Sequence, residues 1–87
     1  MWQFERKNKF KHQFKELSSE TRERVRNALK QLADAEDPTA LGIYKPLLGV
    51  YAFELGRADR ILYSVRFNDN VIELIRVGDH KMVYGKD

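Results

Sequence analysis

The stretch from Val50 to Val77 constrains the fold most strongly, because its side chains alternate as β-strands require. Three such runs occupy residues 51–55, 60–67 and 71–77, and each predicts a strand. Polar breaks separate the runs at residues 56–59 and 68–70, where Gly and Asn tolerate the left-handed backbone of tight hairpin turns. The sequence therefore predicts an antiparallel meander with one row of side chains facing a core.

The two turns also predict which residues face one another. The expected pairs are Tyr51 with Tyr63, Phe53 with Ile61 and Glu54 with Arg60 across the first turn, and Phe67 with Val71, Tyr63 with Ile75 and Ile61 with Val77 across the second. The apolar row should pack against helices, and the residues expected in the core are Phe14, Leu29, Leu32, Ile61, Tyr63, Val65, Ile75 and Val77. The opposite row carries polar side chains and is free to hold a site.

Two helices are predicted before the meander, over residues 7–17 and 19–35. Each carries apolar residues at helical spacing on one face. Ser18 or Ser19 can cap the second helix, and Asp37-Pro38 ends it because proline cannot continue the hydrogen-bond ladder. We expect an α+β fold in which this helical hairpin packs on one face of a small antiparallel sheet. Residues 2–5 suit a short strand, and a further short strand is an alternative for the polar tail at residues 78–84.

Length and composition restrict the classes of function. The 87 residues predict one domain, residues 1–87. With no Cys and two His, we expect no metal site and no other cofactor. No apolar run approaches the ~20 residues that span a bilayer, and the N-terminus lacks a signal segment. We therefore expect a soluble, cytoplasmic protein without a membrane partner. A net charge of +3 permits a nucleic-acid partner without requiring one.

The polar row of the meander predicts a candidate phosphate site. Arg60 and Arg76 lie on this row, and the same parity extends to His80, near the point where Gly78 faces Arg60. A guanidinium matches phosphate oxygens in a bidentate manner, and a histidine transfers protons near neutral pH. The alternatives are that Arg60 pairs with Glu54, and that Arg76 and His80 are ordinary exposed residues.

Several motifs together resemble those of the RelE/ParE toxin superfamily, the toxin halves of bacterial and archaeal toxin–antitoxin pairs. They follow the predicted helical hairpin and read Tyr51-Ala52-Phe53-Glu54-Leu55-Gly56, Asp59-Arg60-Ile61-Leu62-Tyr63, Val77-Gly78-Asp79-His80 and Val83-Tyr84. The resemblance covers nearly the whole chain and implies a compact α+β fold. It also implies a metal-independent cleavage of mRNA in the ribosomal A site, in which a 2′-hydroxyl attacks the neighbouring phosphate.

The resemblance assigns roles to individual positions. Arg60 matches the family's central arginine, His80 a position that holds arginine or histidine, and Tyr84 lies near a C-terminal tyrosine. Lys45 lies near the basic approach to the first meander strand. The candidate catalytic residues are Arg60, His80, Tyr84 and Glu54, the last as a base, and the candidate RNA- or phosphate-binding residues are Lys45, Arg57, Arg76 and Lys81.

Three departures from the family pattern leave the function open. Ala52 and Glu54 occupy positions that are basic in ribosome-dependent members, and Asp59 stands where an aromatic residue is usual. The chain is therefore expected to be a ribosome-dependent ribonuclease, a ParE-like inhibitor of DNA gyrase, or a weakened toxin that mainly binds its antitoxin. The resemblance also implies an antitoxin partner, which we expect to be an acidic, partly disordered peptide that folds on binding.

Overall fold

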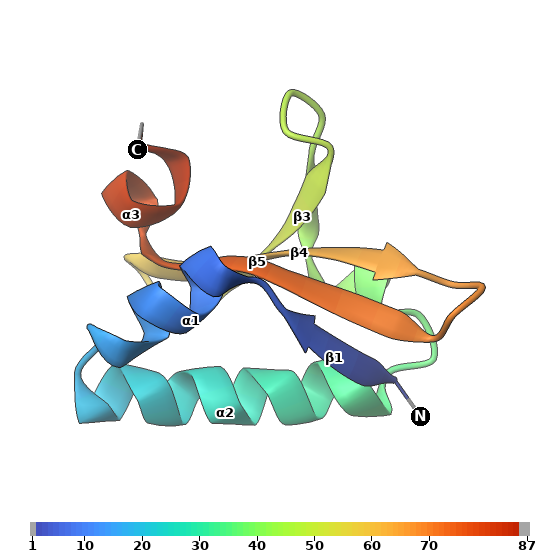
Figure 1. Cartoon of the computed structure of the whole chain (residues 1–87), viewed down its shortest axis with the longest axis horizontal. Coiled ribbons are helices and arrows are strands. Elements are labelled where there is room, and N and C mark those ends of the chain that lie inside the picture. The colour runs from blue at the N-terminus through green and yellow to red at the C-terminus, as the bar shows by residue number, and fades with distance from the viewer. Residues whose placement is uncertain (1, 86–87) are drawn as a thin grey trace.

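The computed structural model describes residues 2–85, in which the main helices precede four consecutive strands and a short helix ends the chain (Figure 1). In chain order they are β1 (Gln3–Arg6), α1 (Asn8–Lys15), α2 (Ser19–Asp34), the 3₁₀-helix η1 (Pro38–Leu41), β2 (Ile43–Lys45), β3 (Val50–Glu54), β4 (Asp59–Arg66), β5 (Val71–Asp79) and α3 (His80–Tyr84). Both predicted helices and all three predicted meander strands are present, so the α+β prediction is confirmed. Within residues 2–85, no helix combines the length and the apolar character needed to cross a bilayer.

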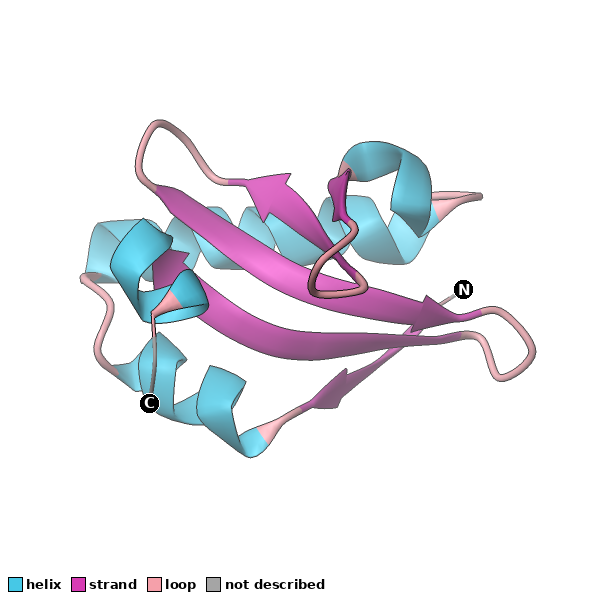
Figure 2. Cartoon of the chain, turned by 90° about the horizontal axis from the view of Figure 1, so that it is seen from above, coloured by secondary structure: helices cyan, strands magenta, loops and turns pink. Residues whose placement is uncertain are grey.

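The strands form one sheet in the order β1-β5-β4-β3-β2. The three meander strands β3, β4 and β5 are antiparallel, as predicted, and β2 adds an antiparallel neighbour to β3 that was not predicted, whereas β1 pairs in parallel with β5. The sheet is therefore mixed rather than purely antiparallel. The long strands β4 and β5 run side by side through its centre, and β1 and β2 form its two edges (Figure 2).

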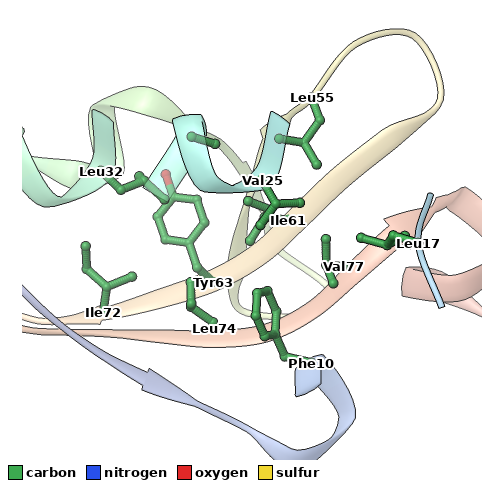
Figure 3. Packing of buried hydrophobic residues seen from close by; sticks show 11 residues of the cluster. Phe10, Leu17, Val25, Leu32, Leu55, Ile61, Tyr63, Ile72, Leu74 and Val77 are labelled. Atoms are coloured by element: carbon green, nitrogen blue, oxygen red, sulfur yellow. The ribbon is translucent and has the colours of Figure 1, made fainter. Parts of the chain in front are cut away.

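The core fills the space between the helices and the face of the sheet that they cover (Figure 3). The side chain of Ser18 accepts a hydrogen bond from the Thr21 N–H and so caps α2, as predicted. The fully buried residues include Val25 and Leu32 of α2 and the strand residues Ile61, Tyr63, Ile72, Leu74 and Val77. The expected core residues Phe14, Leu29 and Val65 are partly buried and pack against this cluster.

The second hairpin differs from its prediction by one residue. The pairs across the first turn and the pair Ile61 with Val77 are confirmed, but Tyr63 faces Leu74 and Arg66 faces Val71. The register shifts between Leu62 and Tyr63, where β5 contains one additional residue. Such a bulge moves every later side chain to the other face of the sheet.

Because of this bulge, the prediction that Ile75 lies in the core under the helices is wrong. Ile75 packs on the outer face of the sheet, against a second cluster of Ala52, Leu62 and Val83. Ile72 and Leu74, which the alternation placed on the polar row, are fully buried instead. The outer face is therefore partly apolar.

The C-terminal segment forms a helix, not the alternative short strand. The Asp79 carboxylate accepts a hydrogen bond from the Met82 N–H at 2.9 Å and caps the first turn of α3. Val83 then covers Ala52 and Leu62 on the outer face. Figure 1 shows α3 and the turn between β2 and β3 on the side of the sheet away from α2. This arrangement creates the candidate site.

Candidate functional site

A cleft of about 390 Å³ lies between α3, the start of β4 and the turn between β2 and β3. Two cations line it, Lys45 at the end of β2 and Arg60 on β4, together with the rings of His80 and Tyr84 on α3. The remaining lining residues are the apolar turn residues Pro46, Leu47 and Leu48. The cleft thus combines positive charge, aromatic rings and aliphatic side chains, and it is the candidate functional site.

Arg60 is the most constrained side chain of the cleft. Strands pair with its backbone on both sides, at Glu54 of β3 and Gly78 of β5. Its side chain is 18% exposed, and its Nε is buried with no hydrogen-bond partner among residues 2–85. A buried donor without a partner is costly, so this guanidinium is prepared to bind an anion.

Two neighbours surround the Arg60 guanidinium. Its Nη2 atom lies 4.0 Å from the Glu54 Oε2, and its centre lies 5.9 Å from the centroid of the Tyr84 ring. Glu54 is 59% exposed, so its carboxylate lies at the solvent side of the pair. The expected Glu54–Arg60 ion pair is present at the limit of contact distance, which leaves most of the guanidinium donors available.

His80 and Tyr84 are the first and last residues of α3 and therefore lie on one face of the helix. Their ring centroids are 4.6 Å apart, with the ring planes tilted by 54°. The Tyr84 hydroxyl is buried and has no hydrogen-bond partner among the described residues. Two buried polar atoms next to the cleft, this hydroxyl and the Arg60 Nε, therefore have no hydrogen-bond partner among the described residues.

Gly78 allows α3 to lie close to the sheet. Its φ is +142°, a conformation that side-chain-bearing residues rarely adopt, and an added Cβ would lie 2.9 Å from the Cβ of Met82. Gln13 of α1 fixes the same region from the edge of β5, beyond the end of β1. Its amide accepts from the Val77 N–H at 2.9 Å and donates to the Met82 carbonyl at 2.7 Å. These contacts set the position of His80 and Tyr84.

Four of the predicted site residues do not line the cleft, and one of them is Glu54, which lies beside Arg60 at its solvent side. The Nη1 of Arg76 points to the carbonyls of Val83 and Gly85, at 3.5 and 3.4 Å, and so binds the C-terminal end of α3. Lys81 lines a separate hollow with residues of α1, and Arg57 is exposed in the turn after β3. Lys81 lies away from the cleft because the helical conformation of residues 80–84 turns it away from the face that carries His80.

The apolar side of the cleft was not predicted. No sequence pattern assigned residues 46–48 to the site, yet Leu47 is 100% exposed at the rim. The signal in the sequence is two leucines between Pro46 and Gly49, in a segment too short for a helix. Exposed leucines in a turn are a reason to look for a ligand.

Two solved structures resemble this chain in fold. The crystal structure of the isolated E. coli RelE toxin matches with a TM-score of 0.75 and 19% identity, covering 91% of this chain and 84% of that chain. The crystal structure of the intact E. coli RelBE toxin–antitoxin complex matches with a TM-score of 0.74 and 22% identity, covering 91% and 96%. Identities this low show a common fold and nothing more.

Comparison by sequence gives the family. Among curated proteins none matches the chain significantly. The family model described as the ParE toxin of the type II toxin–antitoxin system parDE matches residues 4–84. This range contains every element from β2 to α3 and all the cleft residues. The resemblance seen in the sequence is therefore confirmed, and the chain belongs to the ParE toxin family, within the RelE/ParE superfamily of type II toxins.

Proposed function

We propose that this toxin is a metal-independent endoribonuclease that cleaves mRNA in the ribosomal A site. The observation that supports the proposal most strongly is the position of the Arg60 guanidinium beside Lys45, His80 and Tyr84 in one cleft. In the proposed reaction, the 2′-hydroxyl of the mRNA attacks the adjacent phosphorus and the bond to the 5′-oxygen of the next nucleotide breaks. The products are a 2′,3′-cyclic phosphate and a 5′-hydroxyl.

The charged and ring-bearing residues of the cleft, with Glu54 beside it, have the following roles in this reaction. Arg60 and Lys45 stabilise the negative charge that develops on the phosphate oxygens, as preorganised donors do. Glu54 accepts the proton of the 2′-hydroxyl, and His80 protonates the departing 5′-oxygen. The Tyr84 hydroxyl donates a hydrogen bond to a phosphate oxygen. Arg76 holds α3 in place and takes no part in the chemistry.

Substitution of two cleft residues tests the proposal on ribosomes programmed with a defined mRNA. Arg60→Ala should slow cleavage ~100-fold or more, because a preorganised charged donor is lost. His80→Ala should slow it by about 10²–10⁴, as expected for a general acid. Lys11→Ala is the matched control, because Lys11 lies exposed on α1, away from the cleft. Cleavage by the Arg60 variant at the parental rate would contradict the proposal.

Inhibition of DNA gyrase is the second candidate function. The family model is that of the ParE toxin, and Glu54 reduces the positive charge beside Arg60. Pulse labelling after induction separates the two functions: loss of protein synthesis indicates the ribosome, and loss of DNA synthesis indicates gyrase. Both targets lie in the cytoplasm, where we expect residues 1–87 to act as one domain. A toxin without either effect that still binds its antitoxin would correspond to the third, weakened form.

An acidic antitoxin is the partner we propose. A groove of about 420 Å³ on the helical side of the molecule has the apolar residues Phe10, Phe14 and Leu29 and the four cations Arg6, Lys11, Lys15 and Arg26 along it. An amphipathic segment with acidic residues beside its apolar face complements this groove.

Titration with the product of the adjacent gene tests the partner. We expect a complex at micromolar concentration. At a partner concentration of 100 Kd, binding should raise the unfolding free energy of the toxin by ~2.7 kcal/mol and so raise its thermal unfolding temperature. Arg26→Glu should weaken the complex, whereas Arg24→Glu, on the same helix but outside the groove, should not. Absence of any complex at this concentration would exclude that gene product as the partner.

A further inference from the structure

The exposed apolar residues of this protein are concentrated in one short segment. Of six large hydrophobic residues that are exposed in the part of the chain described here, five fall within residues 41–48. Leu47 and Leu48 of this group, 100% and 52% exposed, lie on the cleft that contains Arg60. Leucines that stay exposed in the folded protein, next to a charged site, indicate contact with a ligand.

The turn holds these leucines in a fixed position. The Lys45 carbonyl accepts hydrogen bonds from the Leu48 N–H at 3.1 Å and the Gly49 N–H at 2.8 Å. Pro46 restricts the backbone at the start of the turn, and Gly49 adopts a φ of +68° at its end. A turn closed in this way loses little conformational entropy when its exposed side chains meet a ligand.

The two sides of the cleft complement different parts of one nucleotide. Lys45 and Arg60 supply the positive charge that a phosphate requires, while the adjacent rings of His80 and Tyr84 line the same cleft as the leucines. A nucleotide carries an anionic phosphate and a flat, weakly polar base within one unit. A peptide needs two different residues to present the same two groups.

We infer that Leu47 and Leu48, with the His80 and Tyr84 rings, form a nucleobase site for the nucleotide whose phosphate Arg60 holds. This inference rests on the proposed RNA cleavage, since it identifies how the substrate is positioned at that site. The side chains of residues 46–48 carry no hydrogen-bonding group. The site therefore contacts the face of the base rather than its edges and accepts all four bases with similar affinity.

Binding of short RNA probes tests the inference by NMR titration. The probes are a trinucleotide whose first and central residues are 2′-deoxy, so that neither phosphodiester has an attacking 2′-hydroxyl, the same molecule lacking its central base, and inorganic phosphate. The parent protein should bind the intact probe at least ~5-fold more tightly than the abasic probe, as base stacking predicts. Leu47→Ser should remove most of this difference and leave phosphate binding unchanged. Leu41→Ser, an exposed leucine outside the cleft, should retain it.

Three results would overturn the inference. They are equal affinity for the intact and abasic probes, an unchanged affinity difference between these probes in Leu47→Ser, or a preference for one of the four bases that depends on its edge. Because Leu47 is fully exposed, its substitution should leave thermal unfolding unchanged, and this is checked for each variant. The ribosome assay distinguishes the two proposals. If the A-site codon is cut normally and the intact and abasic probes bind equally, only the base site is overturned. If the intact probe binds more tightly but no mRNA is cut, only the proposed ribonuclease activity is overturned.

Discussion

At the scale of single residues, the buried hydroxyl of Tyr63 has a clear consequence for pH dependence. Its Oη donates a hydrogen bond to the Pro38 carbonyl at 2.7 Å, and the residue is fully buried. Burial raises the pKa of Tyr63 above its usual value, and the nearby Tyr51 and Asp37 raise it further. The pKa of Tyr63 is therefore higher in the folded state than in the unfolded state. The stability that the protonated Tyr63 hydroxyl supplies is fully present below the unfolded-state pKa of about 10. That stability is lost as the pH rises through the folded value.

Tyr63→Phe tests this consequence by urea unfolding over a pH series. At pH 7 the variant should be less stable by about 1 kcal/mol, because a buried hydrogen bond is lost. Above pH ~10 the parent should lose stability more steeply than the variant, since only the parent must ionise a buried tyrosine on unfolding. Tyr44→Phe is the control, because Tyr44 is exposed. Parallel pH profiles for the parent and Tyr63→Phe would contradict the assigned pKa direction.

Some residues of the cleft could be predicted from the sequence and others could not. Alternation and turn length were enough to place Arg60 opposite Glu54 and Gly78. The burial of the Arg60 Nε depends on α3 lying over the sheet, which no local pattern indicates. Gln13 is a polar residue between the apolar positions of the first helix, yet it is only 7% exposed. Its two hydrogen bonds reach residues far along the chain, so the sequence spacing contains no signal for them.

At the scale of elements, the position of α3 decides whether the site exists. Gly78→Ala adds a Cβ against Met82 at a φ of +142°. We expect α3 to move away from the sheet and ribosomal cleavage to fall sharply, with a loss of about 1–3 kcal/mol in unfolding free energy from the strained backbone.

Gly56→Ala provides a matched control for this effect. Gly56 has a φ of +140°, and the nearest atom to an added Cβ is the Arg24 Nη1 at 3.8 Å. The control should therefore lose similar stability from backbone strain and keep its activity. Equal loss of activity in both variants would show that strain, rather than the placement of α3, is responsible.

The first hairpin was predictable and the second was not, for a physical reason. In the first hairpin no residue is added to either strand between the turn and the Tyr51–Tyr63 pair, so the turn length gives the register correctly. In β5 the residues Leu74 and Ile75 are both apolar, and either can face the core. The bulge resolves this choice by burying Leu74 under the helices and Ile75 under α3. The alternative strand at the C-terminus was wrong because the Asp79 cap begins a helix there.

At the scale of the whole molecule, the sheet separates the main hydrophobic core from the candidate functional site. The helical hairpin and the main core lie on one face, and the cleft and α3 lie on the other. Cleft substitutions such as Arg60→Ala therefore leave the main core intact, and their effects on activity can be measured in a folded protein. The acidic partner that we propose would occupy the helical side, so binding there can coexist with an unblocked cleft.

The chemistry of the RNA ends is the most direct test of the proposed cleavage. Purified protein is added to ribosomes programmed with a defined mRNA, and the new 3′ ends are analysed by mass spectrometry, with Arg60→Ala and Lys11→Ala in parallel. We predict a cut in the A-site codon that leaves a 2′,3′-cyclic phosphate, formed by the parent and Lys11→Ala and strongly reduced with Arg60→Ala. No cut at that codon, or a cut by the parent that leaves a free 3′-hydroxyl, would contradict the proposed reaction.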